Sequence, residues 1–158
     1  MNPAASLDSD IFLMAGQMSV HAQPVTIRTI LGSCVAVCLW DSVSPLAGMN
    51  HYLLPYPLEV ETADDRFGSV SIPRLIRAMW RKGAQSRNLQ AAVIGGGSPL
   101  AALGTTAVGD GNVEVAKAVL GEQRIPIVRQ DTGGAHGRKV LFKTVRAELC
   151  IEHVCGWP

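Results

Sequence analysis

The sequence predicts a single α+β domain in which two helices pack against one face of a pair of β-sheets. Segments in which apolar and polar residues alternate as in strands outnumber segments with helical periodicity. The strand segments come largely in hairpin-like pairs, which favours antiparallel sheets over a doubly wound fold. A length of 158 residues and a hydrophobic content of 47% are sufficient for one core without disulfide or cofactor.

Residues 1–10 are expected to form a flexible lead-in to a single domain over residues 11–158. The lead-in carries Pro3, two acidic residues and no basic residue, and the apolar run over residues 11–15 is too short for a signal peptide. No stretch of about 18 apolar residues could cross a bilayer. We therefore expect a cytoplasmic protein that does not insert into a membrane.

The first half of the chain is predicted to be rich in strands. The expected strands are residues 11–14, 18–20, 25–30, 35–40 and 46–54. The first two flank a turn at Gly16, as in a hairpin. Leu31-Gly32-Ser33 interrupts the run that continues at residue 35, and strand parity places Met49 and His51 on one face.

The second half alternates helices and strands. The clearest helix is predicted over residues 72–82, with Ser71 as its cap, Pro73 in its first turn and Gly83 as its stop. A second helix is predicted over residues 112–120. The remaining expected strands are residues 89–94, 125–129, 140–144 and 148–154.

Charge and cysteine usage limit the classes of partner and cofactor. A formal net charge of +1 gives no general attraction for nucleic acid. Cys34 and Cys38 would lie about 13 Å apart along a strand, too far for one zinc ion. We therefore expect neither a metal nor a cofactor, and interpret Cys38, Cys150 and Cys155 as packing residues.

Two glycine-rich segments lack the spacing of phosphate-binding motifs. Gly95-Gly96-Gly97 is interpreted as a turn at which two backbone segments approach closely. Gly133-Gly134 is consistent with an anion-binding nest or with a hairpin loop, and the loop is favoured.

The position of Cys34 indicates chemistry as an alternative to packing. The thiol follows Gly32 and Ser33 at the start of a strand, where backbone N–H groups can face a developing oxyanion. His51 lies 17 residues further on (51 − 34), so the next antiparallel strand can return it alongside the thiol. An imidazole beside a thiol is the minimum requirement for acyl transfer, and a packed core histidine is the alternative.

Several motifs together resemble one family. The run Leu31-Gly-Ser-Cys-Val-Ala-Val-Cys-Leu-Trp-Asp41 followed by Gly48-Met-Asn-His51 resembles the signature of CheD-type chemoreceptor glutamine deamidases. The resemblance covers roughly residues 11–154. It continues through Phe67-Gly-Ser-Val-Ser-Ile-Pro73, Gly95-Gly96, Gly111-Asn112-Val113, Asp131-Thr-Gly-Gly and Gly137-Arg-Lys-Val-Leu-Phe142.

This resemblance implies that Cys34 is the nucleophile and His51 the base of a protein-glutamine glutaminase. The substrate would be a glutamine side chain in the cytoplasmic helices of a methyl-accepting chemotaxis receptor, and the product glutamate. The resemblance also implies a layered α/β/β fold similar to the catalytic domain of the cytotoxic necrotizing factor toxins. A regulatory complex with a CheC-type phosphatase is a further implied partnership.

One position departs from the family pattern. A threonine six positions before the cysteine is the third catalytic residue in some members, and here that position is Arg28. Thr29, five positions before Cys34, is the candidate for this role. A shift of one residue in a strand reverses the face of a side chain, so Thr29 meets the thiol only if the turn at Gly32 restores its direction.

Two alternatives to deamidation remain open from the sequence. A thioester on Cys34 could be transferred to an amine rather than to water, which would make the protein a transglutaminase. The presence of Arg28 is also consistent with a non-catalytic adaptor that binds chemoreceptors or a CheC-type phosphatase.

Overall fold

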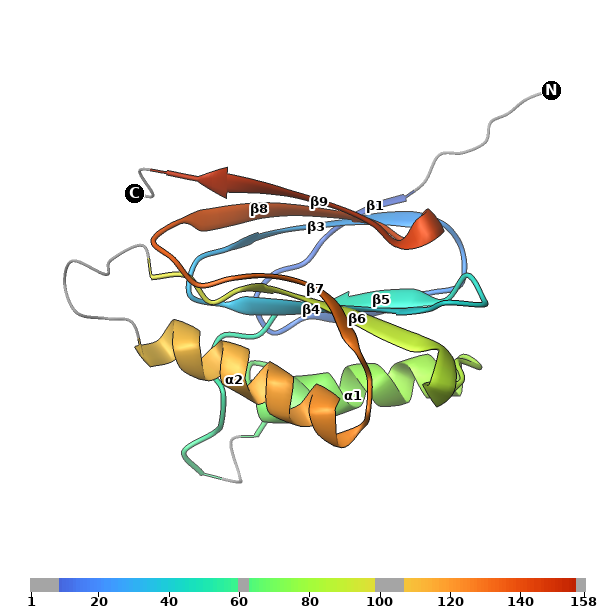
Figure 1. The fold of residues 1–158 in the computed structure, drawn as a ribbon, viewed down its shortest axis with the longest axis horizontal. Helices are drawn as coiled ribbons and strands as arrows, with labels where there is room; N and C mark the ends of the chain where they lie inside the picture. Colours follow the sequence, from blue (N-terminus) through green and yellow to red (C-terminus); the bar gives the residue numbers. More distant parts are fainter. Residues whose placement is uncertain (1–8, 60–62, 99–106, 156–158) are drawn as a thin grey trace.

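The computed structural model describes residues 9–59, 63–98 and 107–155. Within this part of the chain, a four-stranded sheet, a five-stranded sheet and a pair of helices form three successive layers (Figure 1). The predicted α+β class, with helices on one face of a pair of sheets, is confirmed. The predicted lead-in falls mostly on residues 1–8, which lie outside the described residues. Ser9 and Asp10 already belong to the first strand.

The four-stranded sheet has the order β1-β3-β8-β9. Its strands are β1 (Ser9–Phe12), β3 (Val25–Leu31), β8 (Gly137–Lys143) and β9 (Glu148–Val154). β1 runs parallel to β3, whereas β8 is antiparallel to both of its neighbours. Along β3, Ile27 and Leu31 are buried while Arg28 and Ile30 are exposed, so one face of this sheet points into the molecule.

The five-stranded sheet has the order β2-β5-β4-β6-β7. Its strands are β2 (Met18–His21), β5 (Ala47–Asn50), β4 (Val35–Asp41), β6 (Leu89–Gly95) and β7 (Ile127–Thr132). Only the β6–β7 pair is parallel among its described pairs. Because this sheet is covered on both faces, its central strand β4 is almost continuously apolar and buried.

Both helices are longer than predicted. α1 spans Gly68–Arg81 and α2 spans Ala107–Glu122. Ser71 is therefore not the cap of α1, because the helix already begins at Gly68 and Ser71 is buried inside it. Gly83 does end α1, with φ +108° and N–H bonds from Gly83 and Ala84 to the carbonyls of Trp80 and Met79. The shorter turns Ser86–Asn88 and Val145–Ala147 are 3₁₀-helical.

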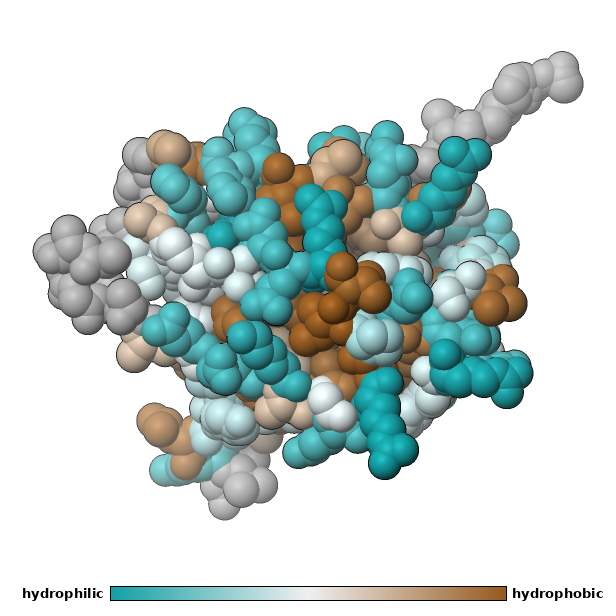
Figure 2. Space-filling view, viewed as in Figure 1, coloured by the Kyte–Doolittle hydropathy of each residue, from teal (hydrophilic) through white to brown (hydrophobic). Residues whose placement is uncertain are grey.

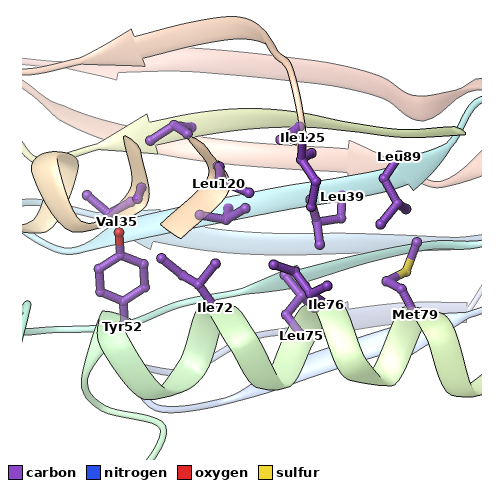
Figure 3. Packing of buried hydrophobic residues seen from close by; sticks show 14 of the residues in the cluster. Val35, Leu39, Tyr52, Ile72, Leu75, Ile76, Met79, Leu89, Leu120 and Ile125 are labelled. Atoms are coloured by element: carbon purple, nitrogen blue, oxygen red, sulfur yellow. The ribbon is translucent and has the colours of Figure 1, made fainter. Parts of the chain in front are cut away.

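Two hydrophobic cores hold the three layers together. Between the helices and the five-stranded sheet, Ile72, Ile76 and Met79 of α1 point toward the sheet, and Met79 lies opposite Leu89 of β6 (Figure 3). Between the two sheets lies a second core, formed by Val25, Ile27, Leu31, Met49, Ile94, Phe142 and their neighbours. Burial of such side chains contributes about 1.5–3 kcal/mol each.

The chain crosses between the two sheets three times at one end of the sandwich. The crossings are residues 13–17 (β1 to β2), residues 32–34 (β3 to β4) and residues 133–136 (β7 to β8). They lie together because the ladders pair Val35 with Gly95, Gly95 with Thr132 and Leu31 with Arg138.

The predicted hairpins at Gly16 and at Gly133-Gly134 are therefore wrong. The strands on either side of each turn lie in different sheets and pair with other strands. Glycines with positive φ are compatible with a hairpin turn and with a crossing between sheets, so local sequence does not distinguish the two.

The surface is mainly hydrophilic on the face shown in Figure 2, with apolar side chains near its middle, where β7 forms the edge of the five-stranded sheet. Val128 of β7 is 52% exposed. Within the described residues, no helix combines the length and apolarity needed to cross a membrane.

Candidate active site

Cys34 lies at the second crossing, where the chain leaves β3 and enters β4. Its thiol is partly buried and packs against the core between the two sheets. The carbonyl oxygens of Gly32 and Cys34 accept hydrogen bonds from the N–H groups of Gly97 and Gly96, both 2.9 Å long. The backbone around the thiol is therefore fixed by the segment that follows β6.

The turn at Gly95–Gly97 brings two backbone segments close together, as predicted. Gly95 has φ +114°, and a Cβ atom there would clash with the carbonyl oxygen of Cys34. A side chain at this position would displace the loop that carries Cys34.

His51 follows the end of β5 and faces the same space as Cys34. The ladder pairs Cys38 with Met49 and Val35 with Tyr52, which places His51 opposite Ala36. Cys34 is two residues before Ala36, so the thiol and imidazole are diagonal neighbours on one sheet face, at about 7–8 Å between Cα atoms. The two sequence-predicted residues are thus brought to one place.

The first crossing holds the backbone of His51. The N–H of His51 donates to the carbonyl of Gln17 at 3.1 Å, and the N–H of Gly16 donates to the carbonyl of His51 at 2.8 Å. These bonds replace the regular β5 ladder at His51. The residues 13–17 thereby fix the position of the imidazole, which no pattern in the sequence indicated.

Thr29 contacts the imidazole from the opposite sheet. Its Oγ1 lies 2.7 Å from His51 Nδ1 and donates a hydrogen bond of 2.8 Å to the carbonyl of Leu13. Because the single hydroxyl proton is used on Leu13, Thr29 accepts from His51 and Nδ1 carries the ring proton. His51 Nε2 then carries a lone pair and no proton. This atom is buried and has no hydrogen-bond partner among the described residues.

The one-residue offset between Arg28 and Thr29 does not turn Thr29 away from the site. Thr29 is on the inward face of β3 with Ile27 and Leu31, whereas Arg28 is on the outer face. Arg28 pairs there with Asp10 at 3.4 Å, and both side chains are exposed. The crossing at residues 32–34 carries the chain to the facing sheet, so Thr29 and Cys34 face the same intersheet space.

Burial favours the neutral form of both Cys34 and His51. Burial raises the pKa of the Cys34 thiol, an effect that its own backbone N–H partly opposes by stabilising the thiolate. Burial also lowers the pKa of His51, partly opposed by the nearby Leu13 carbonyl. A neutral imidazole with a free Nε2 is suited to accept a proton from the thiol during attack.

The carbonyl groups of Gly32 and Ser33, the predicted oxyanion residues, are both held by hydrogen bonds. The Ser33 carbonyl accepts a 2.9 Å hydrogen bond from the side chain of Asn112. Since the peptide is planar and trans, the Cys34 N–H points the opposite way, away from Asn112 and α2. An oxyanion formed beside the sulfur would meet this N–H. Asn112 was quoted only as part of a motif, and sequence reasoning gave it no role.

The remaining cysteines lie away from this pair. Cys38 is buried in the intersheet core, as expected for a packing residue, but the same expectation is wrong for Cys150 and Cys155, which are exposed on and after β9. Across residues 9–59, 63–98 and 107–155, no group of three or more His, Cys, Asp or Glu side chains is arranged to hold a metal ion.

The loop at Gly133-Gly134 is filled by the buried side chain of Arg138. Its guanidinium pairs with Asp131 at 2.9 Å and donates to the carbonyls of Gly133 and His136. Asp131 also bonds to His153. This network closes the third crossing beside the Gly95–Gly97 turn.

Comparison with known proteins identifies close relatives. Residues 53–153 match the family described as CheD chemotactic sensory transduction. Over 141 residues the chain is 47% identical to a probable chemoreceptor glutamine deamidase CheD 1 of Anaeromyxobacter dehalogenans, covering 89% of this chain and 82% of the relative. It is 40% identical over 145 residues to a probable chemoreceptor glutamine deamidase CheD of Sulfurimonas denitrificans, covering 90% and 93%.

These relatives extend the likeness through the site. The match to the family model begins at residue 53 and therefore does not include Cys34 or His51. An alignment over 141 of 158 residues, in contrast, spans both Cys34 and His51 wherever it begins. The same holds for a relative in Trichlorobacter lovleyi, also a probable chemoreceptor glutamine deamidase CheD, at 39% identity over 141 residues, 89% of this chain and 88% of the relative.

Proposed function

The chain belongs to the CheD family, and we propose that it is a chemoreceptor glutamine deamidase, a cysteine hydrolase that converts glutamine side chains of a protein into glutamate. One observation carries the catalytic part of this proposal. The contact between Thr29 and His51 leaves a buried Nε2 lone pair, which has no hydrogen-bond partner in the described part of the chain, on the sheet face that also carries the Cys34 thiol.

In the proposed first half-reaction, Nε2 of His51 takes the proton of the Cys34 thiol as sulfur attacks the δ-carbon of the glutamine carboxamide. The carbonyl oxygen becomes an oxyanion that accepts a hydrogen bond from the Cys34 N–H. The tetrahedral intermediate collapses as the protonated His51 gives its proton to the departing nitrogen. Ammonia leaves, and a thioester remains on Cys34.

In the second half-reaction, Nε2 of His51 accepts a proton from water, and the resulting hydroxide attacks the thioester carbonyl. The carbon–sulfur bond breaks, and the proton on His51 returns to the sulfur. The substrate leaves with a glutamate side chain and the enzyme is regenerated.

Thr29 and Leu13 orient the base in this scheme. Thr29 accepts the Nδ1 proton and is itself fixed by the Leu13 carbonyl, so the imidazole presents its basic nitrogen toward the thiol in each half-reaction. Thr29 therefore acts as a positioning residue.

The proposed substrates are glutamine residues in the cytoplasmic helices of chemoreceptors, and the proposed location is the cytoplasm. The names of the relatives support the receptor as substrate. A CheC-type phosphatase is proposed as a second partner. The adaptor alternative rested on Arg28, and it loses that basis because Arg28 lies on the outer face while Thr29 contacts His51.

We also propose that the layered α/β/β arrangement corresponds to that of the catalytic domain of the cytotoxic necrotizing factor toxins. The order of a sheet, a second sheet and a helix layer supports this correspondence. Superposition of an experimental structure on such a toxin domain would test it, with Cys34 and His51 as the points of comparison.

The function is tested with a purified chemoreceptor cytoplasmic fragment. Intact mass should rise by about one mass unit for each glutamine converted, with one equivalent of ammonia released, and the Cys34→Ala variant should show neither change. Binding of the fragment without mass change or ammonia would favour the adaptor. Incorporation of an added primary amine in place of water would instead indicate transglutamination.

A further inference from the structure

We infer that Asn112 is a positioning residue for the proposed reaction, because its amide orients the Ser33–Cys34 peptide whose N–H receives the oxyanion. This inference rests on the proposed function, and it adds a residue from α2 to a site otherwise built from the two sheets. Asn112 has no exposed surface, so it acts through the backbone of the nucleophile and not on the substrate.

The side chain of Asn112 joins the nucleophile segment to the segment that carries the base. Its Nδ2 group donates to the Ser33 carbonyl at 2.9 Å and to the Leu53 carbonyl at 2.8 Å. Ser33 directly precedes the nucleophile, and Leu53 is two residues after His51. Both protons of one amide therefore set the separation of the two catalytic residues.

The bond to Ser33 also determines what the Cys34 N–H can reach. In a planar trans peptide the carbonyl and the following N–H point in opposite directions. Holding the Ser33 carbonyl toward α2 directs the Cys34 N–H toward the intersheet space, where the Cys34 sulfur lies. If the Ser33 carbonyl lost this donor, the peptide could rotate and the N–H would no longer be preorganised.

Asn112 is held rigidly and at an energetic cost. Its own carbonyl accepts a 2.6 Å hydrogen bond from the Tyr52 hydroxyl, and Gly109 packs against the backbone of Gly96 and Gly97. Its Oδ1 atom is buried and has no partner among the described residues. A buried acceptor left unpaired is unfavourable, so structural stability alone does not favour an amide here.

The test compares Asn112→Leu and Asn112→Ala with the wild-type protein. Leucine keeps the approximate shape of asparagine but removes both donors, and alanine removes the same donors with less bulk. The rate of Cys34 alkylation by iodoacetamide is followed against pH by peptide mass spectrometry, which separates Cys34 from the other cysteines. Deamidation of a receptor fragment is measured in parallel as kcat and KM.

We expect the pH midpoint of Cys34 alkylation to rise by about one unit in both variants, because the N–H that stabilises the thiolate is no longer directed at it. We expect kcat to fall about 100-fold with little change in KM. The matched control is Thr144→Val, which also removes two buried side-chain hydrogen bonds, to the N–H and carbonyl of Val25, at the far end of the sandwich. It should lower thermal stability without moving the midpoint.

Two results would overturn the inference: a wild-type alkylation midpoint in both Asn112 variants, or an equal midpoint shift in Thr144→Val. The proposed function fails by a different result, namely an alkylation profile at Cys34 that is unchanged by His51→Ala together with no deamidation by the wild-type protein. Because the N–H effect on the thiolate does not require His51, the midpoint reports on Asn112 in either case.

Discussion

At the scale of single residues, one hydroxyl proton determines the chemistry available at His51. The Thr29 hydroxyl has one proton, and its bond to the Leu13 carbonyl leaves only a lone pair for His51 Nδ1. The ring proton is therefore kept on the nitrogen that faces Thr29, and the nitrogen that faces the intersheet space is basic.

Replacing Thr29 by valine should reduce deamidation on the order of 100-fold, because the imidazole loses the contact that fixes its tautomer and orientation. The measurement is kcat for ammonia release from a receptor fragment. Thr29→Ser keeps the hydroxyl and should retain most of the activity. Equal kcat in the wild-type protein and Thr29→Val would show that the contact is not needed.

The lowered pKa of His51 makes a prediction about pH. Burial favours the neutral ring, so the folded-state pKa lies below the ordinary value of 6.5. The base form required for attack is present above that folded pKa and is lost as pH falls through it. We expect the acid limb of kcat/KM to have its midpoint below 6.5, and a midpoint above this value would contradict a neutral buried base.

The sequence permitted prediction that Cys34 and His51 lie together, but it did not permit prediction of the groups that hold them. A glycine-serine turn before a cysteine and a histidine on the next strand are visible as residue types at a spacing. The Leu13 carbonyl is a backbone atom that any residue supplies, and Asn112 reaches Ser33 across 79 positions of chain. Neither leaves a local pattern, so both required the folded structure.

At the scale of elements, the crossing over residues 13–17 holds the backbone of His51 in place through hydrogen bonds. Gly16 has φ +87°, and an added Cβ would lie 3.2 Å from Cγ of Arg66. The N–H of this glycine holds the His51 carbonyl. A change in the turn should therefore affect both stability and catalysis.

Gly16→Ala should destabilise the protein by about 1 kcal/mol, because a residue with a Cβ is strained at this φ. It should also lower kcat by displacing the His51 backbone. Gly121→Ala is the matched control, since Gly121 lies within α2 with open space around it and the change should stabilise by about 0.5–1 kcal/mol. Urea denaturation of the two variants measures the change in the free energy of unfolding. If both substitutions changed this free energy in the same direction, the explanation would be contradicted.

The start of α1 shows why element boundaries differed from prediction. Ser71 and Pro73 form a typical helix start, but the helix begins at Gly68 because Gly68 and Ser69 donate their N–H groups to the carbonyls of Leu54 and Pro55. Backbone carbonyls of the preceding loop thus accept the hydrogen bonds of the first helical N–H groups, as a capping side chain would otherwise do. The Gly83 stop was predictable because its cause is local.

At the scale of the whole molecule, the alternation of strand residues was enough to predict two sheets with a helix layer. It could not assign strands to sheets, because β3 and β4 are both apolar strands separated by a short turn and yet face each other across the core. The hairpins predicted at Gly16 and at Gly133-Gly134 failed in the same way, because each of these turns also joins strands of different sheets.

The third crossing depends on an ion pair in which the guanidinium of Arg138 is buried and the carboxylate of Asp131 is partly exposed. Burial alone would raise the pKa of Asp131, but hydrogen bonds from Arg138 and His153 outweigh it and hold the pKa below 3.8. The side chain of Arg138 is 3% exposed. Removing the carboxylate would leave a buried guanidinium without a counter-charge.

Asp131→Asn should destabilise the protein by about 3 kcal/mol near neutral pH, measured by urea denaturation. Because the folded pKa of Asp131 is depressed, its contribution is complete above 3.8 and is lost as pH falls through the folded value. The difference in the free energy of unfolding between Asp131→Asn and the wild-type protein should therefore become smaller in that acid range. Glu152→Gln, an exposed change on β9, should alter stability little at either pH. A constant difference across this range would contradict the ion-pair explanation.

The division of the site between two sheets has a consequence for the order of folding. Thr29 belongs to one sheet and Cys34 and His51 border the other, so the Thr29–His51 contact exists only after the sheets have docked. Until then Cys34 is an ordinary thiol on an incomplete chain, without an oriented base or a preorganised N–H. In the proposed mechanism, catalytic competence is thus acquired late in folding, and a partly folded molecule cannot modify the side chains that it meets.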